Sequence, residues 1–184
     1  MANAVFPPIV SKFPFIPFDK VWKSCNSQSI DPSARDISWK ISHNILPVQQ
    51  VLYARNITRI LRCHFCASDI ETCLHIFYNC SIVEPVIEML YMWISSMVDK
   101  HVDPKSSHII FNLIESTEMN AKRKDLVLSL LSEYKYAIWM CRNLCKFEKK
   151  EITPNFIIMF ILNRVKIRVK ADLIRMPRYT FMSY

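Results

Sequence analysis

The 184-residue chain contains no glycine, whereas average usage would supply about a dozen. Glycine is the residue that most readily adopts the positive φ angles of tight turns and hairpins. Its absence therefore disfavours β-meanders and glycine-rich phosphate loops, whereas helices joined by proline, asparagine, aspartate and serine turns remain easy to build. Biased coding is a second explanation, because the chain is also rich in lysine, asparagine, isoleucine and phenylalanine.

The chain also lacks a long apolar run and a secretory signal. Its most apolar later stretch, residues 156–162, is too short to span a bilayer. Residues 1–18 have no basic beginning, and prolines interrupt their apolar residues. The odd, clustered cysteine count fits a reducing compartment better than a disulfide framework. We therefore expect an intracellular protein, nuclear or cytoplasmic, that is neither secreted nor inserted in a membrane.

What is present is a globular composition with an excess of positive charge. Hydrophobic residues make up 51% of the chain and charged residues 22%, and the length allows a substantial core. The formal net charge is +8, and residues 146–178 contribute nine basic residues against three acidic ones. This charge favours anionic partners.

Helical periodicity dominates most of the chain and predicts a mainly α fold. Asp31-Pro32 supplies an N-cap and a first-turn proline, and Ser81-x-x-Glu84 reads as a capping box. Residues 1–30, rich in proline and phenylalanine, read instead as an extended N-terminal arm. The predicted helices run from Pro32 to near Asn44, from Pro47 to a turn at Asn56, from Ser81 past Met97, over 109–114, over 121–149, and from Pro154 past Leu173.

Residues 63–80, CHFCASDIETCLHIFYNC, hold four of the seven cysteines and two of the five histidines. Their spacing is Cys63-x2-Cys66-x8-His75-x4-Cys80. Three thiolates and one imidazole fill the tetrahedral shell of Zn²⁺ and leave no open position, which is typical of a structural rather than a catalytic metal. We therefore predict one structural Zn²⁺, held in a small CCHC zinc knuckle around which the helical domain is built.

Two other interpretations of this cluster stay open. The residues could be packed cysteines beside an ordinary histidine, or a redox dithiol, although no βαβ pattern surrounds them. Cys73 and His64 are spare candidates that we expect to pack beside the site. Cys141 and Cys145, one helical turn apart without a neighbouring histidine, are expected to be buried thiols.

Two groups of basic residues are candidates for contact with nucleic acid. Arg55, Arg59 and Arg62 recur at i, i+4 and i+7 and lead directly into Cys63. On the last helix, basic residues flank the apolar stripe on both sides: Arg164, Arg168 and Arg175 on one, Lys166 and Lys170 on the other. The alternative is that these are ordinary solvated helix faces.

Aromatic residues near these groups have two interpretations as well. His64 and Phe65 could stack on an unpaired base, but buried packing is the better interpretation of Phe65. Trp39, Trp93 and Trp139 lie in apolar helical stripes and are expected to anchor the core.

The run from Trp39 to Cys80 resembles the zinc-binding segment that follows the reverse transcriptase in non-LTR (LINE-type) retrotransposon polyproteins. The matching features are a tryptophan-containing helix, a Leu-Pro turn, the C-x2-C pair, a Glu-Thr pair, and a His-aromatic helix with a final cysteine. The downstream segment AIWMCRNLCKFEKK is similar to a helix near the ends of such polyproteins. The residues that carry the resemblance are Trp39, Leu46, Pro47, Leu52, Cys63, Cys66, Glu71, Thr72, His75, Phe77, Cys80, Trp139, Arg142, Asn143 and Phe147.

The chain departs from that pattern in two places. Val48 replaces the usual threonine after the proline, and Ala67 and Ser68 stand where a glycine commonly follows the second cysteine. No metal ligand is lost.

The resemblance implies a non-catalytic module that binds RNA or single-stranded DNA and assists reverse transcription, with a reverse transcriptase polypeptide as a further expected partner. No YxDD-like motif and no endonuclease constellation occurs in the chain, so we expect no enzyme activity and no small-molecule substrate. The alternative is a zinc-stabilised protein interaction module without nucleic-acid binding. The expected organisation is an arm at 1–30, the zinc-binding domain at 31–100, and a helical extension at 101–184 with a basic final helix.

Overall fold

The computed structural model describes residues 16–27, 29–113 and 119–175, and in this part the secondary structure is helical. The only strand-like feature there is an isolated antiparallel bridge between Arg62 and Ile70. The predicted mainly α class is confirmed. The helices are α1 (Phe18–Cys25), α2 (Pro32–Ser42), α3 (Gln49–Ala54), the π-helix η2 (His75–Asn79), α4 (Glu84–Val98), α5 (Ser106–Phe111), α6 (Ala121–Glu148) and α7 (Pro154–Arg175).

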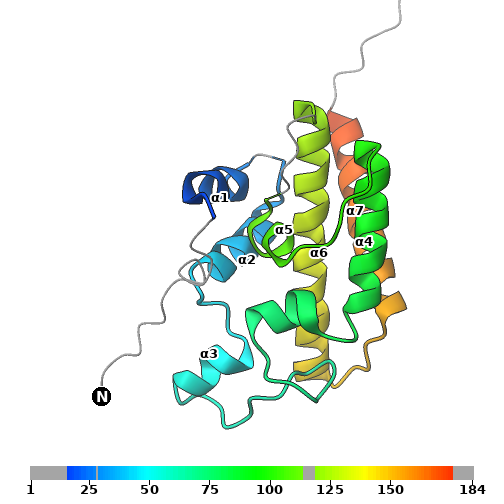
Figure 1. The fold of residues 1–184 in the computed structure, drawn as a ribbon. Coiled ribbons are helices and arrows are strands. Elements are labelled where there is room, and N and C mark those ends of the chain that lie inside the picture. Colours follow the sequence, from blue (N-terminus) through cyan, green and yellow to red (C-terminus); the bar gives the residue numbers. More distant parts are fainter. Residues whose placement is uncertain (1–15, 28, 114–118, 176–184) are drawn as a thin grey trace, which may run out of the picture.

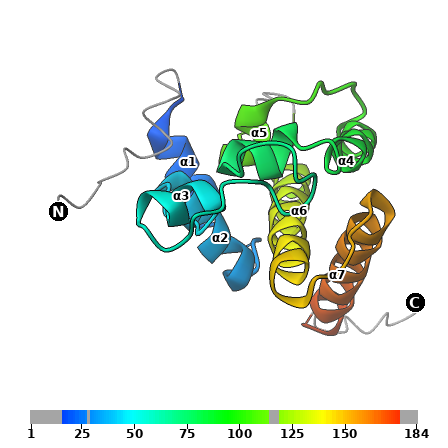
Figure 2. The same cartoon turned by 90° about the horizontal axis from the view of Figure 1, so that it is seen from below.

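The long helix α6 is the centre of the fold. It packs against α2, α4, α7 and η2. In both views α4 and α7 lie on one side of α6 and α2 lies on the other (Figures 1 and 2). The segment that contains η2 lies toward the C-terminal end of α6 (Figure 1). This arrangement ties the predicted zinc segment to a helix from the other half of the sequence.

The chain makes its turns without glycine by using other residues at positive φ. Four of the six such positions in the described part of the chain are asparagine or aspartate, the residues that tolerate the left-handed region best after glycine. Asn56 follows Arg55, the C-cap of the short helix α3, at the predicted turn. The six residues are Asn44, Asn56, Ala67, Asp99, Asn112 and Lys149.

Several predicted helix boundaries are confirmed. Asp31 caps α2, where its Oδ1 accepts a hydrogen bond from the Ser33 amide at 2.9 Å. The long helix α6 covers Ala121–Glu148 and α7 begins at Pro154, close to the predicted positions.

Three local predictions are wrong. Residues 18–25 form helix α1 where we expected an extended arm, because Val21 and Cys25 are buried and α1 packs against α2 and α5. The predicted capping box is absent, since α4 begins at Glu84 after Val83 without a side-chain cap. The short helix α5 covers Ser106–Phe111 and so begins before the predicted 109–114.

The expected core stripes are largely buried, with three exceptions among the described residues, Trp39, Leu126 and Val169, the last of which is 51% exposed. Val86, Ile87, Leu90 and Ile94 of α4 are buried. Leu126, at the exposed start of α6, is not in the core, and Trp39 is 45% exposed and packs its ring beside His43 at 4.2 Å between centroids. The prediction that Trp39 anchors the core is therefore wrong. Residues 1–15 of the predicted arm lie outside the described residues.

Buried Lys135 on α6 makes folding stability depend on pH. Its Nζ has no hydrogen-bond partner among the described residues, and burial lowers its pKa from 10.5 to about 8, against a smaller opposing effect of Cys25. Between pH 8 and 10.5 the unfolded state therefore binds more protons, and stability rises with pH across this window.

We expect Lys135→Met to raise the free energy of unfolding at pH 7 by about 3 kcal/mol, because the neutral side chain avoids the cost of burying a charge. The gain should shrink above pH 8 and vanish near pH 10.5. Urea unfolding of both proteins across pH 7–10.5 measures it. Lys122→Met, at an exposed position of the same helix, is the control; an equal change in both variants would contradict the prediction.

None of the helices in the described part of the chain combines the length and apolar character that crossing a membrane requires.

Candidate metal centre

The four predicted ligands lie together. One ligand atom from each of Cys63, Cys66, His75 and Cys80 lies within 4.8 Å of all the others. Zinc bonds its ligands at about 2.0–2.3 Å, which places two tetrahedral ligand atoms slightly less than ~4 Å apart. Small inward movements of the four side chains would therefore complete the shell. Cys63, His75 and Cys80 are buried and Cys66 is half-buried. The donor set and its spacing fit one structural Zn²⁺.

A tight turn presents Cys63 and Cys66 to the same point. The Ala67 amide donates to the Cys63 carbonyl at 3.0 Å, and the Phe65 amide donates to the Cys63 sulfur at 3.4 Å. Ala67 closes the turn at φ 56°, the left-handed conformation that glycine adopts most easily. Alanine thus takes the conformation required where related segments commonly have glycine.

The π-helix η2 explains how His75 and Cys80 can share one ion at a spacing of five. The Cys80 amide donates to the His75 carbonyl at 2.9 Å, which is the i→i+5 bond of a π-type turn. At the start of this segment, Thr72 Oγ1 accepts from the His75 amide at 2.9 Å. The turn brings both side chains to the side facing the C-x2-C pair.

The two ring nitrogens of His75 have different roles. Nε2 lies 3.4 Å from the Cys66 sulfur, among the ligand atoms, whereas Nδ1 lies 3.9 Å from the exposed Asp69 carboxylate. A carboxylate on the far side of a ligating imidazole favours the tautomer with its lone pair toward the metal.

As free thiols, Cys63 and Cys80 are joined by a hydrogen bond. The Cys63 thiol donates to the Cys80 sulfur, and this bond together with burial raises the pKa of Cys63. Accepting the same bond lowers the pKa of Cys80. Zinc binds cysteine as the thiolate, so metal binding releases the thiol protons of Cys63, Cys66 and Cys80 and weakens at low pH.

Comparison with known families agrees with this geometry. Residues 12–86 match the family model described as zinc-binding in reverse transcriptase, and the match contains all four candidate ligands. This segment is a reverse-transcriptase-type zinc-binding domain. It is an accessory, metal-binding domain rather than a catalytic one. Comparison with curated proteins and with solved structures finds no significant match.

A buried ion pair connects the zinc-binding domain to α6, beyond the matched residues. Glu71 and Arg142 are 0% and 1% exposed at their side chains, and Arg142 donates from Nη2 and Nε to Glu71 Oε1 at 2.6 and 3.0 Å. Glu71 also accepts from the amides of Gln49 and His64 at 2.9 and 3.1 Å. One carboxylate thus holds α3, the C-x2-C turn and α6 together.

The pairing of these two residues was not predicted, although the resemblance singled out both. They lie 71 positions apart, and nothing in the local sequence indicates that they meet.

The remaining cysteines and His64 lie outside the ligand cluster, as expected. Cys73 and Cys141 are buried. Cys145 is half-buried and donates to the Lys150 carbonyl at 3.2 Å, so the prediction of a buried thiol is confirmed for Cys141 and is wrong for Cys145. The His64 ring lies against Gln49, with 2.7 Å between His64 Nε2 and Gln49 Nε2. Phe65 is partly buried and packs on the core, which agrees with the packing interpretation.

Arg55, Arg59 and Arg62 are exposed, but they do not lie on one helix. Helix α3 ends at Ala54, and the left-handed residue Asn56 begins a loop that leads to Cys63. The i, i+4, i+7 spacing therefore defines no helical face. Among the described residues, no carboxylate pairs with any of the three arginines.

The two groups of basic residues on α7 lie in different surroundings. Arg164 Nε donates to Glu133 Oε2 at 2.8 Å, and Arg168 lies 3.5 Å from the same carboxylate and donates to the Ser29 carbonyl. Glu133 is buried, so these arginines neutralise an internal charge instead of forming the predicted free basic edge. Lys166 and Lys170 are exposed as expected, and the side chain of Arg175 lies outside the described part.

The structure adds two lysines to the surroundings of the zinc turn. Burial lowers the pKa of His64, the Glu71 charge opposes this effect, and the positive charges of Arg142, Lys146 and Lys149 reinforce it. Lys146 and Lys149, at the C-terminal end of α6, therefore lie near the C-x2-C turn. The basic run that starts at Lys146 was visible in the sequence, but its position beside the zinc turn was not.

Proposed function

We propose that this chain binds RNA or single-stranded DNA through its zinc end, as a non-catalytic module. The observation that carries the proposal is the set of basic residues around a closed metal shell. We call this set the zinc-end basic surface; it comprises the exposed residues Arg55, Arg59, Arg62 and Lys149 and the half-buried Lys146.

Charge and rigidity support this function. Three thiolates and a neutral imidazole leave the zinc shell near −1, and Arg142 already neutralises Glu71, so the surrounding cations remain free for other anions. A closed metal shell holds the turn in one conformation, and basic side chains on a rigid frame can contact successive phosphates. Lys166 and Lys170 on α7 are a second, smaller candidate contact.

The resemblance to non-LTR retrotransposon polyproteins supports the biological setting. We propose that the chain derives from such a polyprotein and helps to position template RNA or target DNA for a reverse transcriptase, which would itself be a partner. In this proposal the chain supplies binding and no catalysis.

The test is the salt dependence of binding to a fluorescently labelled single-stranded 20-mer RNA, measured by anisotropy with the zinc-loaded protein. Each phosphate neutralised on a single strand contributes a slope of about −0.7 in log affinity against log salt. Replacing Arg55, Arg59 and Lys149 together by glutamine should reduce the magnitude of the slope by about 2.

The matched control is Lys100→Gln with Lys122→Gln, because both lysines are exposed and lie at the other end of α6. Their replacement should leave the slope unchanged. The absence of RNA and DNA binding at low salt would refute the proposed function.

One observation favours the alternative, a protein interaction module. Large apolar side chains are exposed near the arginines: Tyr53, Ile57 and Ile60 in the same segment, and Ile70 opposite Arg62 in the isolated bridge. If these residues dock on a polypeptide such as a reverse transcriptase, Ile57→Ser with Ile60→Ser should abolish that binding, while Arg55→Glu with Arg59→Glu should spare it. Charge reversal at Arg164 or Arg168 would not distinguish the two functions, because it would disrupt the contact with buried Glu133.

A further inference from the structure

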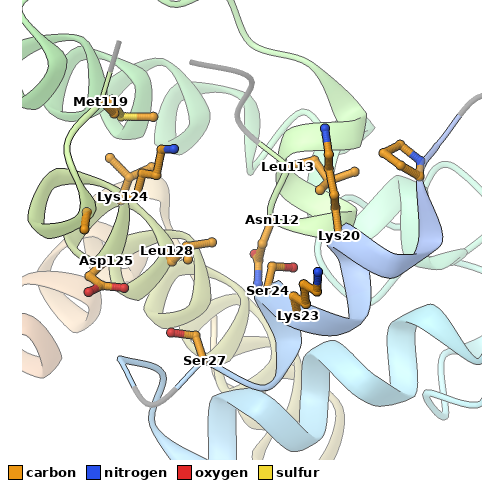
Figure 3. Close-up of a pocket in the computed structure, with 13 residues that line it drawn as sticks. Lys20, Lys23, Ser24, Ser27, Asn112, Leu113, Met119, Lys124, Asp125 and Leu128 are labelled. Atoms are coloured by element: carbon orange, nitrogen blue, oxygen red, sulfur yellow. The ribbon is translucent and has the colours of Figure 1, made fainter. Parts of the chain in front are cut away.

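An open pocket of about 820 Å³ lies between α1, the end of α5 and the first turns of α6. Its volume falls in the usual range of small-molecule sites. Lys20 and Lys23 come from α1 and Lys124 from α6, and Asn112 lies between them (Figure 3). Leu113 and Leu128 contribute to an apolar wall.

The charged residues around the pocket favour an anion. All three lysines are exposed and none forms an ion pair among the described residues. The one carboxylate in the lining, Asp125, accepts a hydrogen bond from the Ser29 hydroxyl at 2.7 Å. The pocket also lies at the N-terminus of the 28-residue helix α6, where the helix dipole attracts negative charge.

Asn112 gives this pocket an independent indication of a ligand. Its side chain belongs to a residue only 2% exposed, yet neither amide atom has a hydrogen-bond partner within the described chain. A buried amide without partners is costly, and native structures rarely leave one unsatisfied. Since Asn112 lines the pocket, a polar group of a bound molecule could satisfy both its donor and its acceptor.

We propose that this pocket binds a nucleotide. The lysines would contact the phosphate, the apolar wall would contact the faces of the base, and the Asn112 amide would pair with a base edge that offers one donor and one acceptor, as asparagine does with adenine. The nucleotide could be free or be one unit of a bound strand.

The proposal is independent of the zinc-end basic surface. The pocket is lined by the first residues of α6, whereas Arg142 contacts the zinc-binding domain about 30 Å further along the same helix. Substitutions at one end can therefore be tested without disturbing the other.

Titration calorimetry of the zinc-loaded full chain with AMP tests the site. We expect AMP to bind more tightly than adenosine or inorganic phosphate, because only AMP engages both the lysines and the amide. Lys20→Gln with Lys124→Gln, and separately Asn112→Gly, should each weaken AMP binding at least about tenfold. Glycine suits the φ of 56° at this position, so the second variant removes the amide without straining the backbone.

Two matched controls should leave AMP binding unchanged: Lys122→Gln in the same turn of α6, and Asn56→Gly at another left-handed asparagine outside the pocket. The absence of AMP binding at millimolar concentration, equal binding of phosphate and AMP, or full binding by both pocket variants would each overturn the proposal.

The labelled 20-mer RNA distinguishes the two sources of nucleotide. If the pocket variants weaken RNA binding as well as AMP binding, the pocket holds one unit of the strand. If they weaken only AMP binding, the ligand is a free nucleotide.

Discussion

Cys63→Ser is expected to lose the zinc ion and to leave the protein without a cooperative unfolding transition. Metal in such a site contributes about 10 kcal/mol or more of apparent folding free energy, which is comparable to the whole stability of a typical domain, about 5–15 kcal/mol. The effect should extend beyond the zinc turn, because Phe77 in η2 is fully buried and its carbonyl accepts a hydrogen bond from Tyr134 of α6 at 2.8 Å.

Metal content by mass spectrometry of the native protein, together with thermal unfolding followed by circular dichroism, measures both parts of this prediction. The parent should contain one zinc per chain, and prolonged chelation should reproduce the Cys63→Ser result. Cys145→Ser is the matched control: this cysteine lies outside the ligand cluster, and a serine hydroxyl can keep its bond to the Lys150 carbonyl. A parent without zinc, or a Cys63→Ser protein that retains it, would contradict the assignment.

The zinc site could be predicted from the sequence because its determinants are local. All four ligands fall within 18 residues, and their chemistry and spacing identify the metal without knowledge of the rest of the fold. The positions of α6 and α7 were predictable for a similar reason, since a long apolar period and a first-turn proline act within one helix.

The errors arise where a residue's role depends on a distant neighbour. On α7 the apolar period correctly places Arg164 and Arg168 on a flank, but it cannot show that this flank faces Glu133 of α6. Helix α1 has only eight residues and depends on packing rather than propensity. The spacing of Arg55, Arg59 and Arg62 is helical, but the helix has already ended before them. Asn56 turns the backbone into the left-handed region, and nothing in the spacing of the arginines indicates this.

The buried pair of Glu71 and Arg142 leads to the second large prediction. We expect Arg142→Met to lower the free energy of unfolding by about 3–5 kcal/mol, because methionine fills similar space but leaves the Glu71 carboxylate buried without its cation. For a chain of this length the loss corresponds to a fall in Tm of about 10 °C. Thermal unfolding of the zinc-loaded proteins measures it.

Arg123→Met is the matched control, since it removes the same charge from a pair with Asp99 that is largely exposed. Exposed pairs contribute about 0–1 kcal/mol, so this variant should unfold close to the parent. Equal losses in the two methionine variants would contradict the prediction, because they would show that the buried pair contributes no more to stability than the exposed one.

A double-mutant cycle separates the ion pair from the other contacts of Glu71. Glu71→Gln removes the charge, but it also places an amide NH₂ group where the backbone amides of Gln49 and His64 already donate. Because donors then face each other, the single variant should be destabilised as well. With Arg142→Met in place, the same substitution removes an uncompensated buried charge and should cost less than it does in the parent, or should restore stability. The cost of Glu71→Gln in the parent minus its cost in the Arg142→Met background is the coupling free energy between the zinc-binding domain and α6. A value near zero would mean that the two regions are held together by apolar packing instead.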